Sequence, residues 1–472
     1  MNRRLRALKL AACALPAMAL GACSMAPKYV APTPPVPVSW PVGDAYLSQS
    51  EAALPLVSYS EIFRDRRLQS LVEQALINNR DLRVAAANVA AARAQVRVTR
   101  ANQFPAIGLS GSAARTEAGG GSSGDGSNYS LQGGISSFEL DLFGKLANAT
   151  QAQRDTALST EAAARTVRLG LVADLAQAWA NYAADRDLLQ IAQATAANAE
   201  RGVALTGARL KGGVAPRTDL RQAEQVLETA RGDVASQTTA LAQDVNAIRL
   251  LVGADFDESL LPGNIGEVNQ SLAVLPAGTS SQVLLRRPDV VEAEYSLRAA
   301  NADIGVARAE LFPSISLTGL LGFASDALSS LFDKGAFAAT GTASATWSIF
   351  NAGGRTANVE VAKAQRDAAL ATYEKAIQTA FSEVADALAD QGTLAERVRA
   401  ASSYTEAAAD TARLTEATYR QGIASSLDNL DAQRSLYTAR QQEIAVRLAF
   451  ASNRITLYRV LGGDQATPAQ DR

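Results

Sequence analysis

The chain has 472 residues, with 45 basic and 47 acidic side chains, a net charge of −2 and no histidine. The absence of histidine excludes Ser-His-Asp and Cys-His catalysis and removes the commonest metal ligand. The balanced charge argues against a nucleic-acid binder. The sequence also shows no nucleophile–base pair, metal cluster or phosphate loop, so we expect a protein that is not an enzyme.

The first residues predict a secretory signal peptide over 1–22. Basic side chains precede a short apolar run, Leu10–Leu20, which is too short for a transmembrane helix. The run ends in Leu-Gly-Ala-Cys, which resembles a bacterial lipobox, so we expect cleavage before Cys23 and lipid on its side chain. The alternative is an ordinary signal peptide that contains a cysteine. Ser24, rather than aspartate, follows the cysteine, which in lipoproteins of this type implies transfer to the outer membrane.

The rest of the chain contains an internal repeat. The Phe-Pro step at 104–105 recurs at 312–313, and Gly213 and Asp219 recur as Gly422 and Asp428. Offsets of 208 or 209 hold across separate blocks, which indicates a duplicated unit. We therefore divide the chain into a signal peptide (1–22), a lipidated arm with an equatorial segment (23–61), repeat 1 (62–253), a linker or equatorial segment (254–279), repeat 2 (280–462) and a C-terminal tail (463–472).

Each repeat predicts the same elements in the same order. A helix ends at the Phe-Pro step, because a residue before proline avoids the helical conformation. A β-hairpin follows, and then a very long helix, a glycine-containing turn and a return helix. The expected ranges are 68–101, 104–142, 146–211, 212–216 and up to Leu251 in repeat 1, and 282–309, 312–350, 356–421, 422–426 and up to Leu461 in repeat 2.

The strand segments alternate apolar and small polar residues, which is the period of a β-strand with two different faces. After the signal there is no apolar run of 18 residues, so any membrane crossing must use β-strands. Four strands cannot close a membrane barrel, because the smallest outer-membrane barrels have eight. Several copies would then pool their strands. The alternative is a coiled-coil adhesin or structural lipoprotein in which the strands form a small sheet.

Several sequence blocks resemble one known family. They are Cys23 with its Pro-rich arm, Leu285-Arg-Arg-Pro-Asp-Val290, Ala307-Arg-Ala-Glu-Leu-Phe-Pro-Ser314, Trp347-Ser-Ile-Phe-Asn-Ala-Gly-Gly354 and Asp428-Asn-Leu-Asp-Ala-Gln433. Together they make the chain similar to an outer-membrane factor of the TolC superfamily, in its lipidated OprM/NodT branch. The similarity covers essentially the whole mature chain.

The resemblance implies a mainly α fold with transmembrane β-strands: a homotrimer with a twelve-stranded outer-membrane β-barrel, and long periplasmic αα-hairpins that form an α-barrel. It implies the exit duct of a tripartite efflux pump, with a periplasmic adaptor and an inner-membrane transporter of the RND type as partners and no cofactor. Such a duct conducts drugs or other small toxic compounds passively. The alternative cargo is a type I secreted protein or metal ions, and the lack of histidine makes metal ions less favoured.

The resemblance also implies a gate at the two hairpin turns. Asp428 and Asp431 lie one helical turn apart and match the paired aspartates that ring the constriction. An aspartate pair at a helix start can instead stabilise the helix dipole. Tyr419 matches the family's gating tyrosine, and we expect its hydroxyl to bind Asp219, the repeat-1 counterpart of Asp428. Ala424 stands where the TolC member has an arginine, so the lock must differ here.

Overall fold

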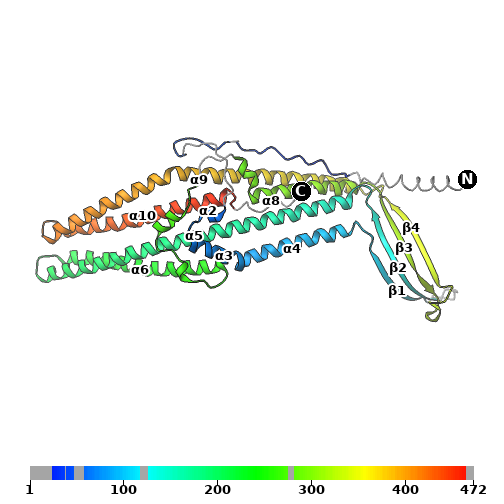
Figure 1. Cartoon of the computed structure of the whole chain (residues 1–472), viewed down its shortest axis with the longest axis horizontal. Helices are drawn as coiled ribbons and strands as arrows, with labels where there is room; N and C mark the ends of the chain where they lie inside the picture. Colours follow the sequence, from blue (N-terminus) through cyan, green and yellow to red (C-terminus); the bar gives the residue numbers. More distant parts are fainter. Residues whose placement is uncertain (1–23, 38, 47–57, 117–125, 275–280, 464–472) are drawn as a thin grey trace. The chain divides into compact units, whose positions relative to one another are not determined.

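The computed structural model describes residues 24–37, 39–46, 58–116, 126–274 and 281–463 (Figure 1). The predicted signal peptide, Cys23 and the tail from residue 464 lie outside the described residues. The chain forms two compact units. Unit 1 contains the described residues up to Thr33, Asn88–Glu161 and Glu292–Glu374; unit 2 contains Pro34–Ala87, Ala162–Val291 and the described residues from Lys375 onwards.

The two repeats follow the same order of elements, which confirms the predicted internal duplication. Within repeat 1 and its flanks the elements are α2 (Tyr59–Ile62), α3 (Arg66–Asn78), α4 (Arg80–Ala101), β1 (Ile107–Thr116), β2 (Gly126–Leu140), α5 (Lys145–Lys211) and α6 (Arg217–Val252). The linker forms η1 (Glu258–Leu260) and α7 (Ile265–Ser271). Repeat 2 contains η2 (Ser281–Arg286), α8 (Pro288–Ala309), β3 (Ser314–Ser325), η3 (Leu328–Ser330), β4 (Phe337–Thr346), α9 (Gly354–Arg420) and α10 (Ser426–Val460).

The first helix of each repeat is interrupted, whereas the sequence predicted one continuous helix. In repeat 1 the break is at Asn79, whose side-chain oxygen accepts hydrogen bonds from the N–H groups of Asp81 and Leu82 at 2.8 and 3.1 Å. Asn79 therefore caps α4 and starts a new helix. In repeat 2 the regular helix begins only at Pro288, because proline is suited to the first helical position.

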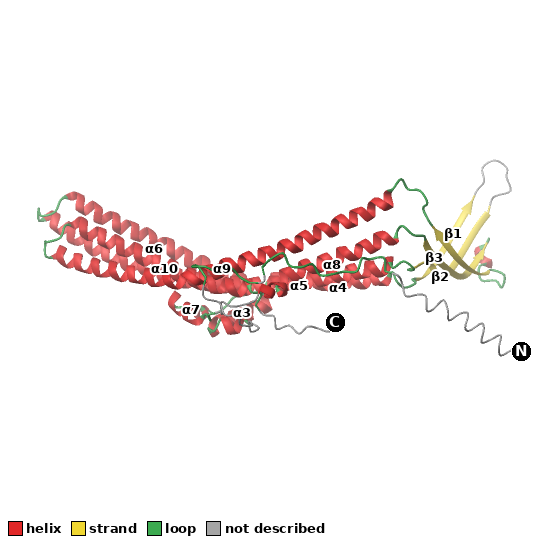
Figure 2. Ribbon diagram, turned by 90° about the horizontal axis from the view of Figure 1, so that it is seen from above, coloured by secondary structure: helices red, strands yellow, loops and turns green. Residues whose placement is uncertain are grey.

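The four strands form one antiparallel sheet (Figure 2), in which their order is β1-β2-β3-β4 (Figure 1). The central pair joins the two repeats, with Leu131 opposite Phe323 in the β2–β3 register. The outer strands β1 and β4 each have one edge that is unpaired within the sheet, and every residue of both strands is exposed. Ile107 and Leu109 of β1 are 82% and 77% exposed, so the sheet presents apolar side chains on its surface.

Unit 2 has a core of aromatic and aliphatic side chains. Phe63 lies edge-on to Tyr458 with ring centroids 5.0 Å apart, and Trp40 stacks on Phe381 at the same separation. Trp179 is fully buried and donates a hydrogen bond to the carbonyl of Leu260 at 3.0 Å. The short segments around α2, η1 and α7 thus pack on the long helices. Among the described helices, none is both long enough and apolar enough to cross a membrane.

Candidate functional site

The two hairpin turns of unit 2 have the same backbone geometry. Gly213 and Gly422 adopt left-handed conformations with φ of +74° and +79°. Each glycine N–H donates to a carbonyl three residues earlier, Leu210 or Tyr419, and both distances are 3.0 Å. This arrangement ends a helix and needs a residue without a Cβ, which explains why both turns contain glycine. The repeat has therefore conserved its turn geometry between the two halves.

Asp428 lies in the first turn of α10 and caps that helix. Its N–H donates to the Ser425 hydroxyl at 3.1 Å, while its carboxylate accepts from the Ser425 N–H at 3.2 Å and from the Ser425 hydroxyl at 2.7 Å. This reciprocal pair is a capping box. The carboxylate also lies in the first turn of α10, where it can stabilise the helix dipole, which is the alternative role stated above. The side chain is nevertheless exposed to solvent.

Asp219 occupies in α6 the position that Asp428 has in α10, and Asp431 lies one turn further along α10. Asp431 is exposed and forms an ion pair with Arg434 of the next turn at 3.5 Å. Asp219 is half-buried in the first turn of α6, where a carboxylate is favoured by the helix dipole. The structure therefore puts all three predicted gate carboxylates within the first two turns of the helices that follow the hairpin turns.

Tyr419 is buried near the end of α9, but it does not bind Asp219 as the sequence suggested. Its hydroxyl lies 3.5 Å from the hydroxyl of Thr206, and its side chain is only 6% exposed. The guanidinium of Arg209 lies over its ring, 4.3 Å from the centroid. The predicted hydroxyl–carboxylate bond is therefore wrong within one chain, because α5 supplies the neighbours of Tyr419 and Asp219 lies beyond the turn on α6.

Sequence reasoning missed the hydroxyl–carboxylate bond that does join the hairpins. The hydroxyl of Tyr437 on α10 donates to the Asp233 carboxylate on α6 at 2.6 Å. Burial and this carboxylate raise the pKa of Tyr437. Tyr437 and Asp233 are separated by 204 residues, and each lies in an ordinary polar helix face, so no local signal marks them as partners.

A second missed feature is a pair of carboxylates between α5 and α6. Asp185 and Asp244 lie close enough to interact, and burial together with the Asp185 charge raises the pKa of Asp244 to about 7. Burial also raises the pKa of Asp185. Two like charges in a half-buried site disfavour double ionisation. The pair therefore favours a state that holds a proton at neutral pH.

The Arg-Arg-Pro-Asp block has a structural role in unit 2. Arg287 is 7% exposed and pairs with Asp289 and with Glu383 of α9, both at 2.7 Å. It also donates to the carbonyl of Val460, at the end of α10, at 2.9 Å. Burial lowers the pKa of Arg287, but the two carboxylates outweigh it and raise the pKa overall. One side chain thus joins the start of α8 to α9 and α10.

The residues that follow Cys23 are held against α8 and α5 in unit 1. Arg308 and Asn301 donate hydrogen bonds to the carbonyls of Met25 and Pro27, at 3.1 and 2.8 Å. A Cβ at Gly305 would lie only 2.7 Å from the backbone nitrogen of Ala26, so the arm approaches α8 closely at a glycine. Cys23 itself lies outside the described residues, and its lipidation stays a prediction.

A sheet with open edges, joined twice to long helical hairpins, defines an outer-membrane channel subunit of the efflux type. The model for the family described as outer membrane efflux protein matches the chain twice, over residues 71–254 and 279–463. The chain belongs to this family. Its members are efflux channels, so the chain is not an enzyme.

Individual relatives agree over nearly the whole chain. The antibiotic efflux pump outer membrane protein ArpC of Pseudomonas putida is 41% identical, covering 95% of this chain and 94% of its own. The cation efflux system protein CusC of Escherichia coli K12 is 38% identical, covering 95% and 97%. The crystal structure of CusC matches with a TM-score of 0.84 over 94% of this chain and all of that chain. The open state of the Neisseria gonorrhoeae MtrE channel matches with a TM-score of 0.83 at 33% identity, covering 93% and 98%.

Proposed function

We propose that this chain is the exit duct of a tripartite efflux pump, and that three copies assemble to form it. The observation that carries the proposal is the four-stranded sheet, whose outer strands β1 and β4 are open to pairing and fully exposed. Such edges are unstable in isolation, and pairing between copies would remove them. Three copies would supply twelve strands for a barrel in the outer membrane.

The helical part supports assembly in the same way. Helix α4 has no buried residue along its 22 positions, and its Val84 and Val98 are both 59% exposed. A helix gains most of its stability from packing an apolar face, so α4 needs a further partner surface. A neighbouring copy would supply that surface in a periplasmic α-barrel.

The cargo that we propose is drugs or other small toxic compounds, passed on from a periplasmic adaptor and an inner-membrane transporter of the RND type. Antibiotic and toluene efflux pumps are named among the relatives. CusC, at 38% identity, is named for cation efflux, so metal ions are a second candidate. The absence of histidine from the whole chain favours the first.

We also propose lipid on Cys23 and a gate at the two turns. In support of the anchor, the described segment Met25–Pro27 after Cys23 is held on α8 by hydrogen bonds to its carbonyls. Asp428 and Asp431 remain exposed, so three copies would bring six carboxylates around one axis. Such a ring would favour cations and bind multivalent cations. Tyr419 and Asp219 flank this ring from the other helices.

Deletion of the gene tests the proposed cargo. We expect several-fold lower minimal inhibitory concentrations of antibiotics or aromatic solvents, restored by the wild-type gene. Sensitivity to metal salts alone would favour cations instead.

Radiolabelled palmitate should be incorporated into the wild type but not into Cys23→Ser, and equal labelling of both proteins would contradict the lipid anchor. Purified protein should form ion-conducting channels in planar bilayers.

A further inference from the structure

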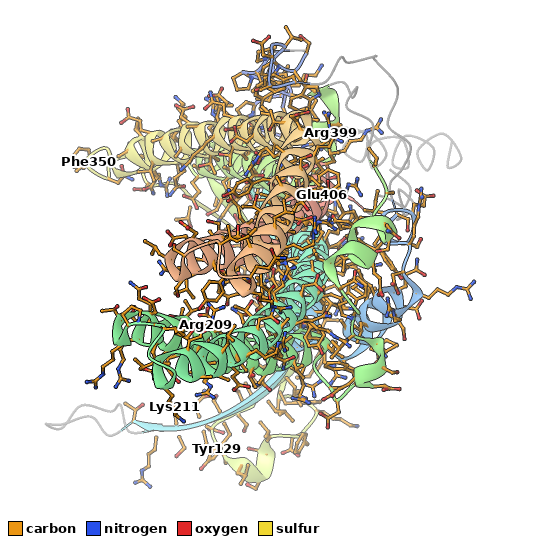
Figure 3. The ribbon with its side chains drawn as sticks, turned by 90° about the vertical axis from the view of Figure 1, so that its left-hand side faces the viewer. Tyr129, Arg209, Lys211, Phe350, Arg399 and Glu406 are labelled. Carbon is orange, nitrogen blue, oxygen red and sulfur yellow. The ribbon has the colours of Figure 1, made fainter. Side chains whose placement is uncertain are left out.

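Arg209 lies in the last turn of α5, in the first hairpin (α5–α6), and reaches the C-terminal end of α9 in the second hairpin (α9–α10). Its Nη2 donates to the carbonyl of Tyr419 at 3.0 Å and to that of Arg420 at 3.5 Å. Its guanidinium carbon lies 4.3 Å from the centroid of the Tyr419 ring. In Figure 3, Arg209 lies on the side of the α5–α6 hairpin that faces α9–α10. One side chain therefore makes both a stacking contact and hydrogen bonds across the hairpins.

The carbonyls that Arg209 contacts are those at the C-terminal end of α9. Such carbonyls have no partner further along the helix, and this end carries the negative pole of the helix dipole. The Tyr419 carbonyl accepts both from Arg209 and from the N–H of Gly422 in the turn. A guanidinium suits this position because it is permanently charged, planar and able to stack and donate at once.

The contact is not duplicated by the repeat. At an offset of 209, Tyr419 corresponds to Leu210 and Arg209 corresponds to Thr418. Leucine has neither an aromatic face for a cation nor a hydroxyl. The Thr418 hydroxyl makes a hydrogen bond within α9 instead, donating to the carbonyl of Leu414 at 3.2 Å. The cross-hairpin contact therefore runs in one direction only, from the first hairpin to the turn of the second.

We propose that Arg209 is the positioning residue that fixes the second hairpin turn against the first hairpin and so sets where Asp428 and Asp431 stand. The proposal rests on the proposed function, in which these carboxylates line the gate. Only the residues 421–424 separate α9 from the capping box that Ser425 forms with Asp428 at the start of α10. A displacement of the Tyr419 and Arg420 carbonyls is therefore transmitted over a short, hydrogen-bonded turn.

Arg209→Ala tests the proposal in planar bilayers, with purified channels and without adaptor or pump. Loss of a hydrogen bond to a charged donor should raise the open-to-closed ratio of the tip about tenfold, seen as larger mean conductance. Arg209→Lys keeps the charge but loses the planar stack, so we expect an intermediate value. Tyr419→Phe keeps the ring and the carbonyl and should resemble the wild type. Tyr419→Ala loses the ring but keeps the backbone carbonyl that accepts from Arg209, so it should give an intermediate value, as Arg209→Lys does.

Lys211→Ala is the matched control, because Lys211 lies in the same last turn and, in Figure 3, on the side facing away from the second hairpin. Equal conductance of Arg209→Ala, Lys211→Ala and wild type would overturn the role of Arg209 while leaving the duct intact. Absence of channels from the wild type would instead overturn the proposed function. If Arg209→Ala does not assemble, Arg209→Lys decides: a wild-type conductance then contradicts the proposal.

Discussion

At the scale of single residues, the asymmetry between the repeats lies in a few side chains around the turns. Both turns share glycine geometry, yet within the described part of the chain the arginine contact from the other hairpin is made to the second turn alone. Sequence spacing correctly indicated that Asp428 and Asp431 are neighbours on one helix. It could not indicate the partner of Tyr419, because Thr206 lies 213 residues away and no local pattern links the two positions.

The carboxylate pair of α5 and α6 predicts a pH-dependent stability. The pKa of Asp244 is raised to about 7 by burial and by the charge of Asp185, compared with about 3.9 in an unfolded chain. The folded protein therefore binds more protons than the unfolded chain between these values, so this pair lowers stability as the pH rises through that window. Above pH 7 the ionised pair destabilises the folded protein by its full amount.

Asp244→Asn should remove most of this cost, because an amide can donate to the remaining Asp185 carboxylate. We expect it to stabilise the protein by about 1 kcal/mol at pH 8.5, a discounted value because solvent screens the half-exposed pair. At pH 5 the gain should be smaller. Thermal unfolding followed by circular dichroism measures this, with Asp174→Asn, an exposed carboxylate of α5, as control. A gain that does not change with pH would contradict the coupling.

At the scale of elements, the order of helices and strands could be predicted because glycine turns and Phe-Pro steps mark the ends of each element. The break at Asn79 could not, since an asparagine within a helical pattern is usually tolerated. The start of α8 at Pro288 did have a signal in the sequence, because proline favours the first helical position. Asn79 becomes a cap because its side chain also donates to the carbonyl of Leu251 on α6. That partner is distant in sequence, so tertiary contact decided where the helix starts.

Arg287 contacts residues of three helices, α8, α9 and α10, and its removal should lower the stability of unit 2. Arg287→Ala removes the guanidinium that donates to Asp289, Glu383 and the Val460 carbonyl. We expect a loss of about 2–3 kcal/mol, below the range for a fully buried pair, because both carboxylates are partly exposed. Arg286→Ala is the control, since Arg286 is exposed. Equal unfolding temperatures for the two variants would show that the Arg287 contacts add no stability.

At the scale of the whole molecule, the sequence indicated that four strands need strands from elsewhere, and the sheet has the open edges that this requires. The number of copies came from the family resemblance. Four strands per chain limit the number of strands in the closed barrel to multiples of four. They do not determine the number of copies, because barrels of different size can all satisfy the backbone hydrogen bonds of their strands. The proposed trimer is therefore tested by finding which strands meet between copies.

A photoreactive amino acid at Ser112 of β1 should cross-link to β4, residues 337–346, of another copy. The same amino acid at Ser130 of β2 is the matched control, because Ser130 pairs with Ser112 across the sheet but lies on an inner strand. Its adducts should stay within one chain. Mass spectrometry of cross-linked peptides distinguishes the outcomes, and dominant intrachain adducts from Ser112 would count against edge-to-edge assembly.

The exposed edges of β1 and β4 also bear on how such a protein is made. Before it meets another copy, a newly exported subunit has two open strand edges and a helix α4 without buried residues. Open strand edges can pair with strands of any other chain, so correct closure of the proposed barrel competes with aggregation. The balance between correct assembly and aggregation then depends on the subunit concentration. Overexpression should therefore favour aggregated chains over correctly assembled oligomers.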